Sequence, residues 1–283
     1  MNKRPTLSVV ILTKNQEKNI SICLNSLFGQ SYKDFEVIVI DANSRDNTAN
    51  IAKAWGCRVL KEEGGHGFGF ARNLGINASR GDLILFLDTD VFLTSRYCLE
   101  KAVKRLEEHK ADVLLARLRF PDTPLARYLS KAFPDRLATR WGDYTPCNSF
   151  MLARKSSLID VGLYDENFAE GAEDVDLLYR MHLMNKRVVY DPEIEVFHNA
   201  GYSINEWINK AYRDGFSIAK FDIKHKIKRR LMLATIYPIL ASFYAFLCTR
   251  SLEMLHGNFI LAKERRRGYL DAIKQHRRGK SIR

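Results

Sequence analysis

The sequence predicts an α/β protein: an open, mostly parallel sheet flanked by helices, followed by a basic, helical C-terminal region. Over the first 200 residues, short apolar runs rich in β-branched residues alternate with segments of helical period, as in βαβ units. Acidic residues follow several of these runs, where the carboxyl ends of parallel strands meet. Charge sets the C-terminal region apart: residues 210–283 carry 18 Lys/Arg against 5 Asp/Glu, whereas residues 1–209 carry 27 against 28.

Four strands are predicted in the first third of the chain. Leu7–Leu12 and Phe35–Ile40 are β-branched runs, and a shorter run lies near Arg58–Leu60. The fourth, Leu83–Val91, begins with five consecutive apolar residues, so we expect it to be buried on both faces of the sheet. Apolar residues at helical spacing predict the intervening helices, at Ile20–Leu27, Ile51–Trp55 and roughly Phe70–Ala78.

The rest of the chain alternates less regularly. An amphipathic helix is predicted over residues 95–109, and the helical period resumes within Gly171–Arg180. Between Phe120 and Tyr144 the pattern gives way to Pro, Arg and aromatic residues, which indicates a variable or mobile segment near the place where an acceptor binds. The other predicted elements are strands at Asp112–Leu118, Asn148–Ala153, Val188–Tyr190 and Glu195–Phe197, and a helix at Tyr202–Phe221.

Acidic residues are the candidates for chemistry. Asp88 and Asp90 stand one residue apart at the end of the fourth strand, and on an extended backbone they point to the same side, so they can converge on one cation. Asp41 and His198 also follow strands, so all of them could line one rim of the sheet. The pair Glu173-Asp174 begins a helix, where acids also offset the helix dipole.

Several polar residues have simpler structural interpretations. Asp46 suits a helix cap, and Asp176 and Arg180, four residues apart, suit a pair on one helix face. His66 suits a surface loop, and His198 could equally be a hydrogen-bonded histidine at a strand end.

The glycines do not form a dinucleotide or phosphate-cradling loop. Thr13-Lys14-Asn15 follows the first strand, where a dinucleotide-binding protein has Gly-x-Gly-x-x-Gly. The later cluster, Gly64–Gly69, lacks both that spacing and a Gly-Lys-Ser/Thr ending. This excludes a dehydrogenase-type cofactor site.

Five scattered cysteines without a Cys-x-x-Cys pair argue against a disulfide framework or a cysteine zinc site and suit a reducing compartment. After the short basic Met1–Arg4, the apolar run Leu7–Leu12 is too short for the core of a signal peptide. We therefore expect a cytoplasmic protein.

Five segments in order resemble the family 2 glycosyltransferases, which are inverting enzymes with the Rossmann-like, nucleotide-sugar-binding GT-A fold. They are SVVILTKNQEKNI, FEVIVIDANSRDNT, ARNLGINASRGDLILFLDTD, GLYDENFAEGAEDVDLLYRM and RVVYDPEIEVFH, and together they cover about residues 6–200. The resemblance implies a GT-A catalytic domain over residues 1–200, which leaves residues 201–283 as a basic, partly apolar helical region.

The resemblance also implies a role for each matching residue. Thr13, Asn15 and Glu17 line the nucleotide pocket, Asp41 binds the nucleoside, and Arg72 contacts the base or a phosphate. Asp88 and Asp90 match the metal motif, with His198 as a further ligand; Asp90 is the stronger metal candidate, and Asp88 either reaches the ribose or shares the ion. Asp174 matches the catalytic base, with Glu173 orienting it or touching the acceptor.

These implied roles agree with the chemistry of sugar transfer. A nucleoside diphosphate leaving C1 of a sugar builds negative charge that Mn²⁺ or Mg²⁺ stabilises, and two carboxylates and an imidazole suffice because diphosphate and water complete the shell. Inversion needs a base on the opposite face to take the proton of the acceptor hydroxyl. The expected activity is metal-dependent hexosyl transfer from a UDP- or GDP-sugar to a lipid-linked or cell-envelope saccharide.

Two other functions compete with this one. A sugar-1-phosphate nucleotidyltransferase should carry a Gly-rich loop with Arg after the first strand, which Thr13–Gln16 lacks. A non-catalytic scaffold would have no need of Asp41, Asp88, Asp90 and Asp174 together.

The C-terminal region contains Leu231–Cys248, 18 residues without a charge, between the basic runs Lys224–Arg230 and Lys263–Arg267. A spanning helix needs ~20 apolar residues, so three interpretations stay open: an interfacial helix or re-entrant hairpin on anionic lipid, a single span, or a helix docked on the catalytic domain or a second subunit. Without a recognised module, the charge does not indicate nucleic acid. We expect peripheral attachment at the inner face of the cell membrane.

Overall fold

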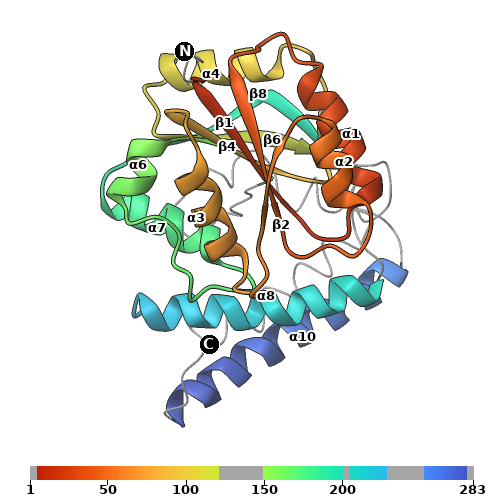
Figure 1. Cartoon of the computed structure of the whole chain (residues 1–283). Helices are drawn as coiled ribbons and strands as arrows, with labels where there is room; N and C mark the ends of the chain where they lie inside the picture. The colour runs from red at the N-terminus through yellow and green to blue at the C-terminus, as the bar shows by residue number, and fades with distance from the viewer. Residues whose placement is uncertain (1–4, 121–148, 200–203, 228–251, 279–283) are drawn as a thin grey trace. The chain divides into compact units, whose positions relative to one another are not determined.

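The computed structural model describes residues 5–120, 149–199, 204–227 and 252–278. Within these residues eight strands form one sheet in the order β3-β2-β1-β4-β7-β6-β8-β5 (Figure 1). The strands are β1 Leu7–Thr13, β2 Phe35–Asp41, β3 Arg58–Lys61, β4 Leu83–Asp88, β5 Val91–Leu93, β6 Val113–Arg119, β7 Phe150–Arg154 and β8 Val188–His198. The predicted segment Phe120–Tyr144 and the apolar run Leu231–Cys248 lie almost wholly outside the described residues.

The sheet is mixed rather than uniformly parallel. Strands β3, β2, β1 and β4 run parallel to one another, as the βαβ pattern predicts. Strand β7 is antiparallel to both β4 and β6, whereas β6 and β8 are parallel and β5 is antiparallel to β8. The predicted fold class is confirmed, because parallel pairings outnumber antiparallel ones and helices flank the sheet.

Helices cover both faces of the sheet (Figure 1). On β1, Val9 and Ile11 face one apolar core together with α1, α2 and α4, and Val10 faces a second core with α3, α6 and α7. Both faces being buried explains why these strands are continuous apolar runs rather than alternating ones. The helices of this layer are α1 Glu17–Phe28, α2 Thr48–Ala54, α3 Phe68–Ala78, α4 Cys98–Glu108, α6 Lys155–Asp160 and α7 Glu173–Leu183.

The fourth strand is shorter than predicted. Strand β4 ends at Asp88, Thr89 and Asp90 form a turn, and Val91 begins β5, which pairs with β8 instead. The hydroxyl of Thr89 donates to the carbonyl of Leu12 at 2.8 Å, which helps to hold the turn against the end of β1. Asp88 and Asp90 therefore do not share one extended backbone, and the argument that they point to the same side of a strand is wrong.

The two short strands predicted near residues 190 and 196 are one strand. Strand β8 runs through both, with a register shift at which Ala116 pairs with Asp191 and Arg117 with Glu195. Pro192 has no N–H for the ladder, and a bulge is where a strand can accommodate it. Tertiary pairing with β6 therefore joins two segments that local pattern separates.

The described residues form two compact units. The second contains α8 Ile204–Lys224, α10 Leu252–Arg277 and the segment Asn167–Ala172. A Cβ built on Gly215 of α8 would lie 1.9 Å from the carbonyl oxygen of Arg265, and one on Gly268 of α10 would lie 2.1 Å from that of Tyr212. The two helices thus touch backbone to backbone. The division into domains at residue 200 stays a prediction.

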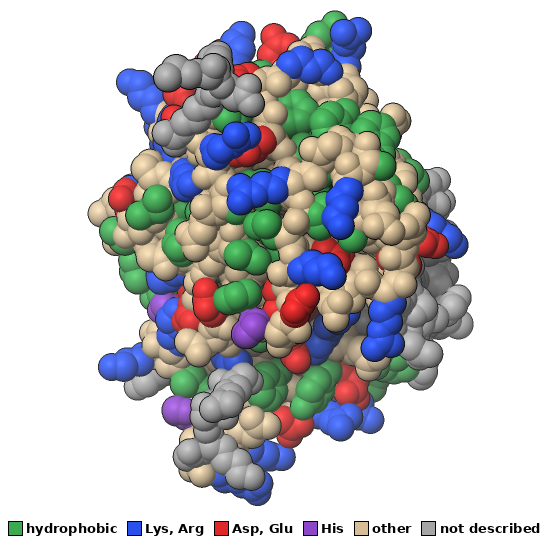
Figure 2. Space-filling model, in the orientation of Figure 1, with side chains coloured by type: hydrophobic (Ala, Val, Ile, Leu, Met, Phe, Trp, Pro, Cys, Tyr) green, Lys and Arg blue, Asp and Glu red, His purple; other side chains and the backbone are tan. Residues whose placement is uncertain are grey.

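Two features bear on membrane association: the distribution of surface charge and the hydropathy of the helices. On the face shown in Figure 2, Lys and Arg side chains lie among acidic and apolar ones rather than in one patch. Among the helices of the described residues, none is both long and apolar enough to cross a bilayer.

Candidate active site

Three of the predicted site residues end neighbouring strands. Thr13 is the last residue of β1 and pairs with Asp41, the last of β2, while Leu12 pairs with Asp88, the last of β4. The carboxyl ends of these parallel strands form one edge, the usual place for ligands in open α/β sheets.

Asn15 and Glu17 join the loops that follow β1 and β2. Asn15 has a left-handed backbone (φ 53°); its N–H donates to the hydroxyl of Ser44, and its Oδ1 accepts the N–H of Arg45, both at 2.8 Å. Oε2 of Glu17 accepts the N–H of Asn47 at 3.2 Å. In this structure both side chains therefore hold the loop after β2 against the loop after β1.

The last side chains of β1 and β2, Thr13 and Asp41, are both buried, but only Asp41 has hydrogen-bond partners among the described residues. The carboxylate of Asp41 accepts the N–H of Ser44 at 3.1 Å and also its hydroxyl. The hydroxyl of Thr13 is buried and has no hydrogen-bond partner among the described residues. Because buried polar groups are nearly always paired, Thr13 is the member of this group best suited to receive a polar atom of a ligand.

The structure brings together two of the three predicted metal ligands. Pairing of Val91 with His198 places Nε2 of His198 3.2 Å from Oδ2 of Asp90. Oδ2 of Asp88 instead accepts the hydroxyl of Ser149 at 2.8 Å. In the part of the chain that the structure describes, no three His, Cys, Asp or Glu side chains are grouped to hold a metal ion.

Arg72 and Glu173 form a buried ion pair between α3 and α7. Nη1 of Arg72 lies 2.6 Å from Oε1 of Glu173, and the two side chains are only 7% and 6% exposed. The guanidinium also lies 5.7 Å from the ring centre of Phe68 and 5.5 Å from that of Tyr164. Sequence reasoning placed Arg72 at the nucleotide and did not foresee this pair, whose members are 101 residues apart.

The charge of Arg72 also links it to the predicted base. Burial alone would lower the pKa of Arg72, but the carboxylates of Glu173, Asp88 and Asp174 raise it above its ordinary value. Asp174, half-buried at the second position of α7, accepts the N–H of Val175 at 2.8 Å. Acids from β4 and α7 therefore lie within electrostatic reach of one guanidinium.

Asn73 and Tyr164 lie beside the candidate site residue Arg72, and neither of them was assigned a role from the sequence. Oδ1 of Asn73 accepts the N–H of Tyr164, and its Nδ2 donates to the carbonyl of Tyr164, each at 2.9 Å. Asn73 could have been found from the sequence, because it directly follows Arg72 in the segment Ala71-Arg72-Asn73, but only the arginine was assigned a role. Burial raises the pKa of the Tyr164 phenol well above its ordinary value, so Tyr164 stays neutral beside Arg72.

Asp46, Asp176 and His66 make structural contacts. The N-cap residue of α2 is Asn47 rather than Asp46, but Oδ1 of Asp46 accepts the N–H of Thr48, the first residue of α2, at 3.1 Å. Asp176 is fully buried and pairs with Arg180 at 2.8 Å. The exposed His66 contacts the carboxylate of Glu62 at 2.8 Å.

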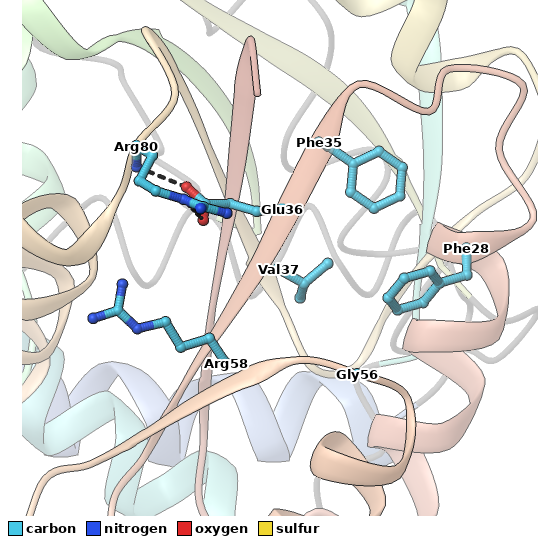
Figure 3. Close-up of a pocket in the computed structure, with 7 residues that line it drawn as sticks. All are labelled: Phe28, Phe35, Glu36, Val37, Gly56, Arg58 and Arg80. Atoms are coloured by element: carbon cyan, nitrogen blue, oxygen red, sulfur yellow. Dashed lines mark hydrogen bonds and ion pairs between the residues drawn. The ribbon is translucent and has the colours of Figure 1, made fainter. Parts of the chain in front are cut away.

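A hollow of about 400 Å³ lies at the other end of β2, where that strand begins (Figure 3). Glu36 and Arg80 form an ion pair of 2.9 Å there. The lining residues are Phe28, Phe35, Glu36, Val37, Gly56, Arg58 and Arg80. None of them is a predicted site residue, and the hollow is not at the carboxyl edge where the acids gather.

The sheet topology and the acids at its carboxyl edge are those of a glycosyltransferase with the GT-A fold. The chain belongs to glycosyl transferase family 2, whose model matches residues 8–162.

Individual relatives agree with this membership. The poly(ribitol-phosphate) β-N-acetylglucosaminyltransferase TarS of Staphylococcus aureus is 34% identical over 119 residues, which are 40% of this chain and 21% of TarS. The chain thus spans about a fifth of that relative's length.

Two solved structures share the fold. One is the mannosyltransferase PcManGT of Pyrobaculum calidifontis with GDP-Man and Mn²⁺ (TM-score 0.64, 19% identity, 99% of this chain and 77% of that one). The other is S. aureus TarS 1–349 with UDP-GlcNAc (TM-score 0.59, 20% identity, 98% and 93%).

Proposed function

We propose that the chain is a metal-dependent, inverting glycosyltransferase that moves a sugar from a UDP- or GDP-sugar to a hydroxyl of a lipid-linked or cell-envelope saccharide. One observation carries this proposal: Thr13, Asp41 and Asp88 end three neighbouring strands at one edge of the sheet, and Asp90 lies 3.2 Å from His198 just beyond β4. The ion pair of Arg72 with Glu173 holds the start of the helix that carries Asp174. That arrangement supports one site able to hold a leaving group and a base. The nucleotide sugars in the two solved structures, GDP-Man and UDP-GlcNAc, support the class of donor.

In the proposed reaction Asp174 is the base. Its carboxylate takes the proton of the acceptor hydroxyl while that oxygen attacks C1 of the sugar, and the diphosphate leaves from the opposite face. We assign the donor nucleotide to the rim formed by Thr13, Asn15, Glu17 and Asp41. The buried hydroxyl of Thr13, which has no hydrogen-bond partner among the described residues, supports this assignment, because a ligand atom would satisfy it.

Asp90 and His198 are the residues that would hold a divalent ion. A carboxylate oxygen and an imidazole nitrogen 3.2 Å apart form a donor pair that suits Mn²⁺ or Mg²⁺, with diphosphate and water as the other ligands. Asp88, one of whose oxygens is engaged by Ser149, has its second oxygen for the ribose or the ion. The ion would stabilise the negative charge that develops on the leaving diphosphate.

We also propose that the C-terminal region meets an anionic membrane surface at the inner face of the membrane. Helix α10 exposes Phe259 and carries exposed cations farther along, among them Arg265, Arg267 and Lys274, each of which also lies near an acidic side chain. Basic residues with an exposed aromatic ring favour the headgroup region of anionic bilayers. Co-sedimentation with vesicles containing anionic lipid, and not with neutral ones, tests this proposal.

The donor is tested by thermal shift with UDP- and GDP-sugars in Mn²⁺, because a ligand that binds only the folded state raises the melting temperature. We expect one nucleotide series to stabilise the protein, and Asp90→Asn to weaken that effect, whereas the control Glu108→Gln, an exposed acid on α4, leaves it unchanged.

Transfer of labelled sugar to extracted lipid or envelope saccharide then tests the reaction. Stabilisation without transfer would favour a non-catalytic scaffold, and release of diphosphate from a nucleoside triphosphate and a sugar 1-phosphate would favour a nucleotidyltransferase.

A further inference from the structure

We propose that Arg72 is a positioning residue in a clamp on α3: Arg72 holds Glu173, and hence Asp174, at the start of α7, while Asn73 holds Tyr164 and Glu166 in the segment before that helix. This proposal rests on the proposed function, since it concerns the base of that reaction. It replaces the nucleotide contact that the family resemblance implies for Arg72.

The burial of Arg72 argues against a nucleotide contact. Its side chain is 7% exposed, Nη1 is engaged by Glu173, and the ring centres of Phe68 and Tyr164 lie 5.7 and 5.5 Å from the guanidinium carbon. A guanidinium that binds diphosphate needs N–H groups directed at the ligand. In this structure the contacts of Arg72 are to protein groups from α3, the segment before α7, and α7 itself.

One face of α3 makes all the contacts of the clamp. Positions 69, 72 and 73 are spaced i, i+3 and i+4, so they lie together on the helix. A Cβ on Gly69 would lie 2.8 Å from the carbonyl oxygen of Asp165, so a glycine is needed for this close approach. Asn73 holds the backbone of Tyr164 at both N–H and C=O and also reaches Oε1 of Glu166 at 2.9 Å.

The start of α7 needs such an anchor. Gly171 and Ala172, the two residues before the helix, have φ of 148° and 62°. For Ala172 this left-handed backbone is strained, because its Cβ approaches the following carbonyl. Glu173 is the first residue of α7 and Asp174 the second, so the ion pair to Arg72 fixes the turn that carries the proposed base.

The test compares Arg72→Met with the double variant Arg72→Met/Glu173→Gln. The single change leaves a buried carboxylate without its cation, which is strongly destabilising, whereas the double variant removes both charges and keeps the side-chain volumes. Arg96→Met, at an exposed arginine, is the matched control. The measurements are the dissociation constant of the nucleoside diphosphate that stabilises the wild type, kcat at saturating donor, and amide exchange of residues 173–177.

We expect nucleotide affinity within about threefold of wild type, kcat lower by at least about tenfold, and faster amide exchange at the first turn of α7 in any variant that folds. Loss of nucleotide affinity by tenfold or more in the double variant overturns the proposal, as does unchanged exchange at α7. Affinity and exchange can be measured even if the wild type transfers no sugar, so failure of the proposed function and failure of the clamp are distinguishable.

Discussion

Arg72 illustrates how a charged residue can be held inside a protein. Its carboxylate partner Glu173 and two flanking rings replace the water that it loses, and breaking such a pair by removing one partner typically costs ~3–5 kcal/mol. Oε2 of Glu173 is buried and has no hydrogen-bond partner among the described residues. The residue that fixes the proposed base therefore also offers an acceptor to a ligand hydroxyl.

Asp174 should be essential for transfer and dispensable for donor binding. Because Asp174→Asn removes the base but keeps the shape of the side chain, we expect kcat to fall by ~10²–10⁴-fold while nucleotide affinity stays within about threefold. Initial rates at saturating donor, together with calorimetric nucleotide binding, check this. Glu170→Gln, at an exposed acid nearby in the chain, serves as the control. Retention of more than half of the wild-type kcat would refute the assignment.

Cys57 and Cys98 should resist alkylation in the folded protein. Burial raises the pKa of both thiols to about 12, against an ordinary value of about 8.5, so little thiolate forms at pH 8. We expect iodoacetamide to leave both unmodified under native conditions and to label them in urea, as measured by peptide mass mapping. Labelling of either cysteine at comparable rates in both conditions would contradict the buried positions.

At the scale of elements, the contact between α8 and α10 depends on one glycine from each helix. Gly215 and Gly268 let each backbone approach the other to distances that no side chain would permit. Tyr212 and Tyr269 then reach across to Asp271 and Asp222, at 3.2 and 3.1 Å. The hydrogen bonds therefore depend on the close approach that the glycines allow.

Gly215→Ala should loosen this pair of helices. Alanine favours a helix over glycine by ~1 kcal/mol, but overpacking costs ~1–3 kcal/mol or more, and here the new Cβ meets backbone. We expect net destabilisation, seen as a lower melting temperature by circular dichroism at 222 nm and faster amide exchange in both helices. Asn209→Ala, an exposed position on α8, should be neutral or slightly stabilising. A Gly215→Ala protein as stable as that control would show that the helices do not meet there.

At the scale of the molecule, buried carboxylates make stability depend on pH. Burial alone would raise the pKa of Asp191, but hydrogen bonds from Arg105, the N–H of Glu193 and His109 lower it below its ordinary value. Glu36 behaves in the same way through Ser8 and Arg80. A carboxyl group with a lowered folded pKa stabilises the protein above its unfolded pKa, and this contribution is lost as pH falls through the folded value.

The free energy of unfolding should therefore decrease as pH falls below about 4, the ordinary range of carboxyl groups. We expect Asp191→Asn to cost ~1.5–3 kcal/mol at pH 7 through loss of hydrogen bonds to a charged group, and to make the decrease between pH 5 and 2 shallower than in the wild type. Urea unfolding at a series of pH values measures both effects. An equal slope in wild type and variant would mean that Asp191 does not contribute to acid sensitivity.

Local pattern was enough to predict most elements and the edge on which the acids stand. The strands Leu7–Thr13 and Phe35–Asp41 follow from runs of apolar, β-branched residues, and Asp41 and Asp88 follow those runs directly in the chain. Five segments in order were enough for the family, which the match over residues 8–162 confirms. Strands, the acids that follow them and the family motifs are all patterns of residues a few positions apart, so they can be read directly from the sequence.

Tertiary packing decided what joins distant segments. Strand β7 lies antiparallel between β4 and β6, and β8 joins two predicted segments across a bulge. The direction and the ends of these strands depend on hydrogen bonding to neighbouring strands, which are distant in the sequence. The same holds for Asp90 with His198 and for Arg72 with Glu173, pairs that only the folded sheet and helices bring within reach. A sequence pattern specifies which residues can pair, whereas which of them meet depends on how the elements pack around the two apolar cores.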